Sequence, residues 1–323
     1  MFSLLDTFRA LGDSTRLRIF HLLHAMELAV GEIAQVMGQS QPRVSRHIRI
    51  LVEAGLVERR KEGNWVFLTL ARNADTAPLI AFFEQAQLSP EEMLWRDADL
   101  ARLAAVRAER SRAADSYFAQ HAEEWDAIRS LQVPESAVET AMSAMLAGTP
   151  IGRLLDIGTG TGRMVQLFGE AADHVTAIDR SPDMLRLARA KLPVDAGEKY
   201  ALVMGDFLDL PLDDRSADTV ILHQVLHYAQ APEHALAEAG RVLEGGGRLL
   251  IADFAPHQLE ELRSRDQHAR LGFSDDQIRG WLENAGLELE NVETLEGGVL
   301  TVKLWLGRRP TAKVLPIEER ISA

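Results

Sequence analysis

Leu154-Leu155-Asp156-Ile157-Gly158-Thr159-Gly160-Thr161-Gly162 is the stretch that decides the fold of the longer, C-terminal part of the chain. An apolar run that ends in Gly-x-Gly is typical of a buried strand that leads into a tight turn and a helix. The glycines let backbone amides approach a ligand with no Cβ in the way, and the following helix turns its N-terminus toward a bound anion. The stretch therefore predicts a nucleotide-type binding loop.

The spacing of the glycines argues against a dinucleotide site. The dinucleotide fingerprint is Gly-x-Gly-x-x-Gly, but here Gly162 comes one residue early and Arg163 occupies the fingerprint position. A second apolar run, residues 175–178, ends in Asp179, where a strand-end carboxylate can accept both hydroxyls of a ribose. The two features disfavour an NAD site and favour another ribose-bearing ligand.

Together with Gly205-Asp206 and the apolar run 218–222, these segments resemble the class I S-adenosylmethionine (SAM)-dependent methyltransferases. The resemblance covers roughly residues 115–308 and implies a Rossmann-like, doubly wound α/β domain. It implies that the glycines line the methionine moiety of SAM, that Asp179 holds the ribose, and that Asp206 with Phe207 borders the adenine.

Twelve residues make up the site that this resemblance implies for SAM or its product S-adenosylhomocysteine (SAH). They come from the strand ends, the glycine loop and a leading helix: Tyr117, Asp156, Gly158, Gly160, Gly162, Asp179, Arg180, Met184, Gly205, Asp206, Phe207 and His223. The leading helix, residues 113–126, looks like one that lids the SAM site in many methyltransferases. An aromatic residue such as Tyr117 is at least as often part of a core.

Strand and helix patterns alternate through this part of the chain. The expected strands and helices are residues 154–157, 175–178, 181–185, 201–204, 219–222, 248–252 and 274–286, followed by a hairpin of 287–293 and 300–306. Such alternation predicts a doubly wound sheet with ligand at the carboxyl ends of its strands. The family usually has Pro-Gly before its fifth strand, whereas this chain has Glu244-Gly245-Gly246-Gly247, whose glycines still supply the positive φ of a turn.

Composition indicates an ordinary two-domain protein. The chain has 323 residues, 46% of them apolar, and no cysteine, which excludes disulfides, thiolate metal sites and thiol nucleophiles. It lacks a membrane-spanning apolar run and a signal-peptide pattern, so we expect a cytoplasmic protein without a membrane partner. The net charge of −13 is uneven: residues 1–72 carry ten Lys/Arg against seven Asp/Glu, and the rest carries 25 against 41. The N-terminal part is therefore the better candidate for nucleic-acid binding.

The N-terminal part has the pattern of a winged helix-turn-helix, an α+β fold. Asp13-Ser14 caps a helix, residues 30–38 form a brief helix closed by glycine, and Ser40-Gln41-Pro42 begins a third helix that reaches Gly55. The segments 56–61 and 65–70 form a β-hairpin with a basic tip, a wing able to contact phosphates.

The third helix and the wing carry side chains that read base edges and phosphates in a major groove. These candidate DNA contacts are Ser40, Gln41, Arg43, Ser45, Arg46, His47, Arg49, Arg60 and Lys61. For any single arginine, a solvated helix face is the simpler explanation. Their combination on one helix favours binding to double-stranded promoter DNA.

Residues 4–70 resemble the ArsR family of winged-helix repressors. The resemblance rests on the stretches 11–19, 40–47 and 53–57. It implies a homodimer that binds DNA.

Many ArsR members sense metals through a Glu-Leu-Cys-Val-Cys motif, and the aligned stretch here is Glu27-Leu28-Ala29-Val30-Gly31. Residues 78–113, where the family has its other metal site, contain no histidine. His21, His24 and His47 could form a site, but helical histidines without a carboxylate partner are more often structural. We therefore expect no metal site.

We expect four segments along the chain. Residues 1–75 form the winged helix, residues 76–114 a helical linker for dimerisation, residues 115–309 the methyltransferase-like domain, and residues 310–323 a loose tail. The linker shows a helix start at residues 89–92 and an apolar stripe.

Two functions remain open from the sequence. In the first, the chain is a transcriptional regulator whose C-terminal domain senses SAM or SAH, because its domain order looks like that of SAH-responsive regulators of the SAM and methionine cycle. In the second, it is a methyltransferase of a small molecule that regulates itself through its DNA-binding domain. His223, His227 and Asp253 follow strands at the expected cleft and are the candidate catalytic residues, although loops there are polar in any case.

Overall fold

The chain divides into two compact units in the computed structural model, which describes residues 4–62, 65–71, 76–86, 88–122, 135–192, 197–296 and 298–311. The N-terminal unit comprises residues 1–113 with 258–260, and the C-terminal unit comprises residues 114–257 and 261–323. The predicted loose tail falls almost entirely outside the described residues, as does the end of the predicted leading helix.

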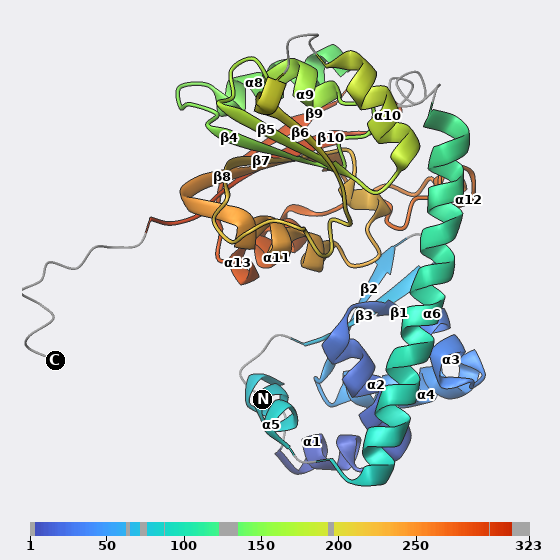
Figure 1. Cartoon of the computed structure of the whole chain (residues 1–323). Coiled ribbons are helices and arrows are strands. Elements are labelled where there is room, and N and C mark those ends of the chain that lie inside the picture. Colours follow the sequence, from blue (N-terminus) through green and yellow to red (C-terminus); the bar gives the residue numbers. More distant parts are fainter. Residues whose placement is uncertain are drawn as a thin grey trace, which may run out of the picture. The chain divides into compact units, whose positions relative to one another are not determined.

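The N-terminal unit is a winged helix-turn-helix, as the sequence predicts. Its elements are α1 (Leu4–Leu11), α2 (Ser14–Ala25), β1 (Leu28–Ala29), α3 (Val30–Met37), α4 (Gln41–Glu53), β2 (Val57–Glu62), β3 (Trp65–Leu70), α5 (Thr76–Gln85) and the part of α6 (Pro90–His121) up to residue 113, labelled in Figure 1. The Asp13 side chain accepts a hydrogen bond from the Arg16 amide at the start of α2, and Gly38 ends α3 with φ 61°.

Helices α3 and α4 pack on each other through residues with no more than about 1% exposure: Ile33, Val36, Val44, Ile48 and Leu51. The hairpin of β2 and β3 is antiparallel, and the two-residue β1 adds to it by pairing Leu28 with Leu68. This core leaves the opposite face of α4 in solvent.

An ion-pair network joins α6 to this core. Asp99 on α6 is 2% exposed and receives two hydrogen bonds from Arg18 of α2, at 2.6 and 2.7 Å. Arg102 donates to the same carboxylate at 2.7 Å. Because a buried carboxylate is stable only when it is paired, this network fixes the first half of α6 against α2.

The C-terminal unit is built on a seven-stranded sheet with the strand order β6-β5-β4-β7-β8-β10-β9. Strands β4 (Arg153–Ile157), β5 (His174–Asp179), β6 (Tyr200–Met204), β7 (Ala217–His223) and β8 (Leu243–Phe254) are parallel. Strand β10 (Val302–Arg308) is antiparallel to both β8 and β9 (Glu288–Leu295). The predicted doubly wound fold is confirmed.

Helices cover both faces of this sheet, as Figure 1 shows. One face carries α8 (Glu135–Leu146), α9 (Arg163–Phe168) and α10 (Pro182–Lys191), and the other carries α11 (Pro232–Val242) and α13 (Asp275–Asn284). The short helices α12 (Glu261–Arg265), η2 (Gly197–Lys199) and η3 (Leu226–Tyr228) lie in connections. Apolar residues fill the space beneath α11 and α13, among them Trp305 with no exposed surface.

The predicted glycine turn before the fifth strand is present as a bulge within β8. Ala217 pairs with Leu243 and Thr219 with Arg248, so residues 244–247 are extra on the β8 side. Gly246 takes a φ of 83°, which only glycine adopts at little cost.

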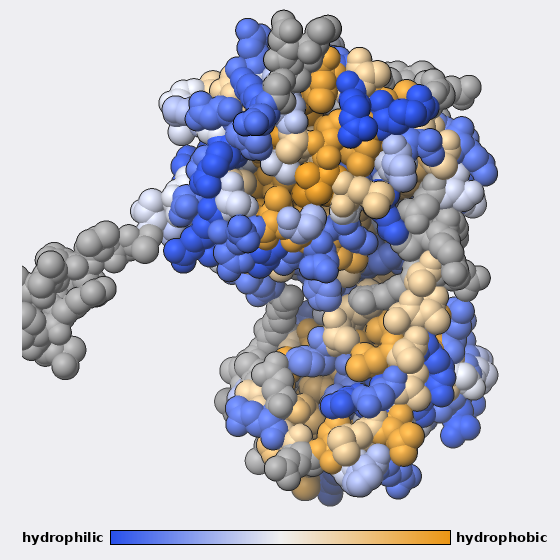
Figure 2. Space-filling view, viewed as in Figure 1, coloured by the Kyte–Doolittle hydropathy of each residue, from blue (hydrophilic) through white to orange (hydrophobic). Residues whose placement is uncertain are grey.

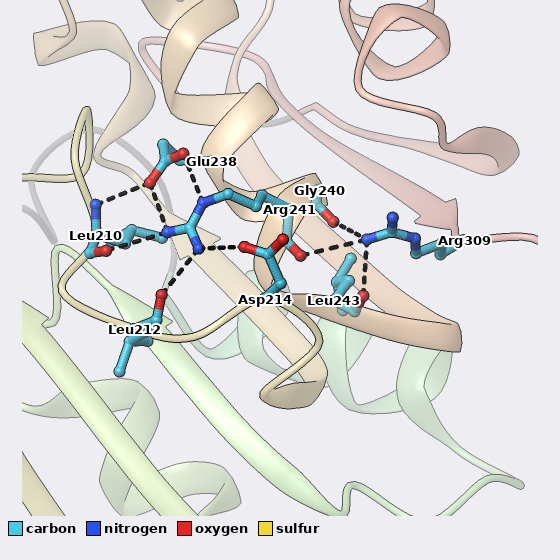
Figure 3. A network of polar contacts seen from close by, with 8 residues as sticks. All are labelled: Leu210, Leu212, Asp214, Glu238, Gly240, Arg241, Leu243 and Arg309. Atoms are coloured by element: carbon cyan, nitrogen blue, oxygen red, sulfur yellow. Dashed lines mark hydrogen bonds and ion pairs between the residues drawn. The ribbon is translucent and has the colours of Figure 1, made fainter.

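Two arginines hold the chain around α11 (Figure 3). Arg241 donates to Glu238, to Asp214 and to the carbonyls of Leu210 and Leu212, and so ties the loop before β7 to the helix. Arg309, just after β10, donates to the carbonyls of Gly240, Arg241 and Leu243. Carbonyls at a helix C-terminus lack partners within the helix, so Arg309 acts as a cap supplied from another strand.

Candidate functional site

A cleft opens at the carboxyl ends of β4, β5 and β7 in the C-terminal unit. It encloses about 750 Å³, part of which is open to solvent. Residues from the glycine loop, from the end of β5 and from the segment after β7 form its wall. This is the edge of the sheet at which the sequence places the ligand.

The glycine loop is fastened to the end of β5. The amides of Gly158 and Thr159 both donate to the Ile178 carbonyl, at 2.8 and 2.9 Å. A Cβ on Gly158 would lie 2.3 Å from Val225 Cγ2, and Gly158 has a φ of 69°. Only glycine fits here, so the loop backbone itself forms the cleft surface.

Asp179 organises the loop with both of its carboxylate oxygens. One accepts from the Gly160 amide at 2.9 Å, and the other accepts from the Ser181 amide at 2.8 Å. Burial raises the pKa of Asp179 above its ordinary value, and the amide hydrogen bonds oppose this rise only in part. The carboxylate lies on the wall of the cleft, and its oxygens can accept further hydrogen bonds from hydroxyls.

Nine of the twelve expected SAM-site residues form the cleft wall: Asp156, Gly158, Gly160, Asp179, Arg180, Met184, Gly205, Phe207 and His223. The other three have different surroundings within the described part of the chain. Gly162 lies against Ala188, where a Cβ would come within 3.1 Å of the alanine Cβ. Asp206 accepts from the Leu208 amide, and the Tyr117 hydroxyl donates to Asp266 at 3.3 Å.

Tyr228, which follows β7 with His223, lies on the wall as its place after the strand predicts, whereas sequence reasoning missed other residues of the wall, including Phe118, Gln224 and Val225. Gln224 has a φ of 50°, a left-handed conformation that costs a residue with a side chain about 1–3 kcal/mol. Its amide donates to the Ala252 carbonyl at 2.7 Å, which holds this conformation in place. No local sequence signal indicates such a residue.

A buried group of polar aromatic residues adjoins the cleft. His227 Nδ1 lies 2.8 Å from Asp253 Oδ1, and the His227 ring lies 4.2 Å from that of His268. All three residues have no more than 3% exposure. Burial, followed by the neighbouring His227, lowers the pKa of His268, so His268 is neutral at physiological pH.

Of the three predicted catalytic residues, His223 therefore lies on the cleft wall, whereas His227 and Asp253 lie in this buried group. Within the described residues, His227 Nε2 is buried and has no hydrogen-bond partner. Tyr228 connects the group to the cleft wall, and burial raises its pKa well above the ordinary value. The Tyr117 ring packs against that of His121 at a tilt of 33°, and burial, followed by the nearby Asp266, raises the pKa of Tyr117 to about 12.

The candidate DNA-binding face is the outer side of α4. Gln41, Arg43, Arg46 and Arg49 are exposed on it, while Ser45 and His47 are half-buried. Ser40 occupies the position before α4, but its side chain makes no capping hydrogen bond. On the wing, Lys61 is exposed, whereas Arg60 pairs with Glu27 at 2.9 Å and lies over the ring of Phe67.

Two classes of site find no support in the described ranges. Nowhere in them do three or more His, Cys, Asp or Glu side chains gather in a way that could hold a metal ion. Of the helices that the structure describes, none combines the length and apolar character that crossing a bilayer requires.

Comparison with known proteins matches each unit to a family model. Residues 155–251 match a methyltransferase domain, and residues 11–60 match a helix-turn-helix domain. The C-terminal unit thus has the Rossmann-like methyltransferase fold, and the N-terminal unit is a helix-turn-helix domain.

The relatives are methyltransferases that the chain matches in part. An uncharacterized methyltransferase of Mycobacterium tuberculosis is 39% identical over 97 residues, which cover 30% of this chain and 37% of that protein. A malonyl-[acyl-carrier protein] O-methyltransferase of Serratia marcescens is 34% identical over 147 residues, which cover 46% of this chain and 54% of that protein. The chain thus spans about a third to a half of these relatives' length.

Among solved structures, a magnesium protoporphyrin IX methyltransferase of Synechocystis with bound SAH superposes with a TM-score of 0.49 at 18% identity. The superposition covers 62% of this chain and 99% of that one.

Proposed function

We propose that this protein is a DNA-binding transcriptional regulator, of the repressor type, whose methyltransferase-like unit binds SAM or SAH as an effector. The observation that carries the proposal is that one chain contains both an exposed basic helix, α4, and a cleft suited to an adenosyl ligand. His227, the histidine that Asp253 holds in place, is buried, which favours ligand binding over catalysis. We further propose that it controls genes of the SAM and methionine cycle, because the sequence resembles regulators of that cycle.

The cleft fits an adenosyl ligand on the chemistry of its wall. Asp179 offers carboxylate oxygens to the ribose hydroxyls, and Phe207 offers an aromatic face to the adenine. The loop from Gly158 to Gly160 leaves its backbone free of side chains for the methionine end, since a Cβ at Gly158 would collide with Val225. When bound, SAM supplies an electrophilic methyl group on a cationic sulfur, whereas SAH supplies neither the methyl group nor the charge.

The DNA-binding part rests on α4. Its arginines are exposed on the side opposite Val44, Ile48 and Leu51, so the helix can enter a major groove without disturbing its core. Palindromic operators need two recognition helices about one turn of DNA apart, so we propose a homodimer on promoter DNA.

SAM and SAH share their adenine and ribose contacts, so only the sulfur end can provide differential binding energy between DNA-bound and released states. His223 and Tyr228 lie on the wall near the end of β7 and are the residues we propose to sense this difference. A coupling of about 1–3 kcal/mol, or roughly 5–150-fold in operator affinity, is typical of such regulators.

The second candidate function is methyl transfer to a small molecule. It is favoured by the hydrogen bond between His227 Nδ1 and Asp253, which would orient an imidazole as a general base, and by relatives that are named methyltransferases. Methyl transfer would require the buried Nε2 of His227 to become accessible to an acceptor. His223 is the alternative base on the wall itself.

The deciding experiment is fluorescence anisotropy on the protein's own promoter DNA, with SAM and SAH titrated separately, beside a methyl-transfer assay on cell extract. If one ligand shifts the binding curve and the other does not, the regulator is supported. If neither shifts the curve while extract is methylated over many turnovers, the enzyme takes its place.

Variants of α4 test the DNA-binding part of the proposal. Arg43→Ala and Arg46→Ala should each weaken binding and reduce its salt dependence, because each removes a cation that displaces counterions from DNA. Arg279→Ala, an exposed arginine on α13, is the matched control. Equal affinity of all three variants, or binding insensitive to salt, would remove α4 from the DNA interface.

A further inference from the structure

A second cavity lies within the N-terminal unit, between α2, α5 and α6. It encloses about 720 Å³, part of which is open to solvent. The function proposed above makes no use of this cavity.

Three rings form one side of the cavity. The ring centroid of His21 on α2 lies 5.3 Å from that of Phe83 and 5.6 Å from that of Trp95, in edge-to-face arrangements with interplanar angles of 73° and 62°. Leu22 and Leu100 continue this apolar surface. Such a wall suits a flat ring, because aromatic pairs gain energy from edge and offset contacts as well as from burial.

Two polar groups of the lining lack a strong partner. His21 Nε2 has no hydrogen-bond partner among the described residues and almost no exposed surface, so a ligand reaches it only when the imidazole turns toward the cavity. Arg96 pairs with the adjacent Asp97 at 3.0 Å, but both side chains are well exposed, and such a pair contributes little. Arg18, by contrast, is committed to the buried Asp99.

The lining carries two guanidinium groups, Arg18 and Arg96, against one carboxylate, Asp99, so its net charge favours an anion. Burial lowers the pKa of His21, and the nearby His24 and Arg96 lower it further, against the opposite effect of Glu92. A neutral imidazole beside a guanidinium can donate to a carboxylate together with it. A bound carboxylate would satisfy the buried nitrogen and offset the positive charge.

We propose that this cavity binds a small planar aromatic carboxylate, with its ring against Phe83 and Trp95 and its carboxylate between Arg96 and His21. The site lies in the DNA-binding unit and is separate from the adenosyl cleft. Helix α2 packs on α4, so the bound molecule would lie one helix away from the recognition helix. The chain would then receive two chemically different small molecules.

Calorimetry with indole-3-carboxylate as the probe tests the proposal on the full chain. We expect a dissociation constant on the order of 0.1 mM for a ligand of this size. Indole, which lacks the charge, and cyclohexanecarboxylate, which lacks the aromatic ring, should each bind at least roughly tenfold more weakly. Absence of binding by indole-3-carboxylate at about 1 mM, or equal binding of the three probes, overturns the proposal.

Variants locate the site. Arg96→Ala should weaken the probe roughly tenfold or more, because it removes a charged hydrogen bond. Leu100→Trp should weaken it by filling the cavity, while Arg279→Ala should leave its affinity unchanged. Thermal unfolding shows whether each variant is folded. If folded Arg96→Ala and Leu100→Trp proteins bind the probe as the parent does, the cavity is not the site.

Two further measurements test whether the probe binds in the adenosyl cleft instead and whether a second copy of the chain covers the cavity. Asp179→Ala should leave probe binding intact, since that residue belongs to the adenosyl cleft, and loss of binding in this variant would place the probe there instead. A second copy of the chain could also cover the cavity. In that case the probe would bind only at concentrations below those at which dimers form, which would equally overturn the proposal.

Discussion

The position of Gly158, in the loop after β4, accepts no residue other than glycine. Its φ of 69° disfavours any side chain, and its missing Cβ is the space that Val225 occupies at 2.3 Å. Val225 in turn lies beside the strained Gln224 on the cleft wall. The close approach of Gly158, which follows β4, to Val225, which follows β7, therefore shapes this part of the cleft wall.

Gly158→Ala should abolish binding of SAH. The added methyl group would push the loop away from Val225 and add backbone strain of about 1–3 kcal/mol, so the loop could no longer present its amides. Gly280→Ala is the matched control, because a Cβ there meets nothing within 4 Å and should stabilise α13 by about 0.5–1 kcal/mol. Calorimetry with SAH and thermal unfolding check both. Unchanged SAH affinity in Gly158→Ala would separate the loop from the ligand.

Asp179 should make SAH affinity depend on pH. Burial raises the pKa of its carboxyl, so the proton returns at a higher pH than usual, and the protonated form accepts hydroxyls poorly. Affinity should fall as pH is lowered from neutrality toward that raised pKa. Calorimetry between pH 8 and 5 checks this, with Asp179→Asn as a control whose affinity is low and independent of pH. A decline of equal steepness in the control would assign the dependence to another group, such as His223.

The effect of pH on folding stability through Asp179 is opposite to its effect on SAH affinity. Because the folded pKa of Asp179 lies above its ordinary value, the folded protein without ligand holds this proton more tightly than the unfolded chain does. The stabilisation is fully present below the ordinary pKa and is lost as pH rises through the folded pKa. At neutral pH, the ionised carboxylate of Asp179 thus favours ligand binding but lowers the free energy of unfolding of the ligand-free protein.

At the scale of elements, Arg309 shows how a residue after the last strand stabilises a distant helix. Its guanidinium donates to three carbonyls at the end of α11, a helix that lies more than 60 residues earlier (Figure 3). Nothing in the local sequence around residue 309 indicates this cap.

Arg309→Ala should lower the free energy of unfolding by about 1.5–3 kcal/mol, since charged donors to carbonyls contribute more than neutral ones. Arg308→Ala is the adjacent control. Arg308 pairs with Glu290, where both side chains are partly exposed, and donates to one carbonyl, that of Gly246, so its loss should cost less than the loss of Arg309. Chemical denaturation of both variants provides the measurement. Equal losses would show that the three carbonyl contacts of Arg309 contribute no more than the ion pair and single carbonyl contact of Arg308.

The elements that the sequence predicts are those with local signals. The Asp13 cap forms its hydrogen bond, the helices expected at 181–185 and 274–286 begin with Ser181 and Ser274 as N-caps, and the strand and glycine turn at residues 154–162 appear as predicted. The helix expected after Ser40 also forms, although the Ser40 side chain makes no capping hydrogen bond. The missing pieces depend on distant contacts. Strand β1 has two residues and exists only through its pairing with β3.

The same distinction applies to the cleft. The glycine loop and Asp179 follow from strand and turn patterns, but the positive φ of Gln224 depends on a bond to Ala252. The Tyr117 to Asp266 hydrogen bond spans 149 residues and places Phe118, rather than Tyr117, on the cleft wall. Periodicity cannot distinguish two adjacent aromatic residues on one helix.

For the whole molecule, apolar side chains in solvent indicate a partner surface. Leu94 on α6 is 73% exposed, and Leu5 and Phe8 on α1 are 56% and 57% exposed. Figure 2 shows apolar residues among the hydrophilic surface of this unit. Seven of the nine large exposed apolar residues in the described part of the chain belong to the N-terminal unit. Such a concentration, unlike a single exposed side chain, is typical of contact surfaces.

In the homodimer proposed above, Leu94→Lys should separate the two subunits and thereby weaken operator binding. Size-exclusion chromatography with light scattering measures the mass, and anisotropy measures the affinity. Met204→Lys is the control, since Met204 is 67% exposed in the C-terminal unit and should leave the mass unchanged. A Leu94→Lys protein that keeps the dimer mass would move the interface elsewhere.

The position of β10 between β8 and β9 sets an order of events during synthesis on the ribosome. Strand β8 is complete at Phe254, but its neighbour in the sheet begins only at Val302. At roughly 5–20 residues per second, β8 waits about 2–10 s with an unpaired edge, which another chain could join. The helix-turn-helix elements have by then long emerged. Trp305, wholly buried in β10, would therefore report the moment at which the nascent sheet closes.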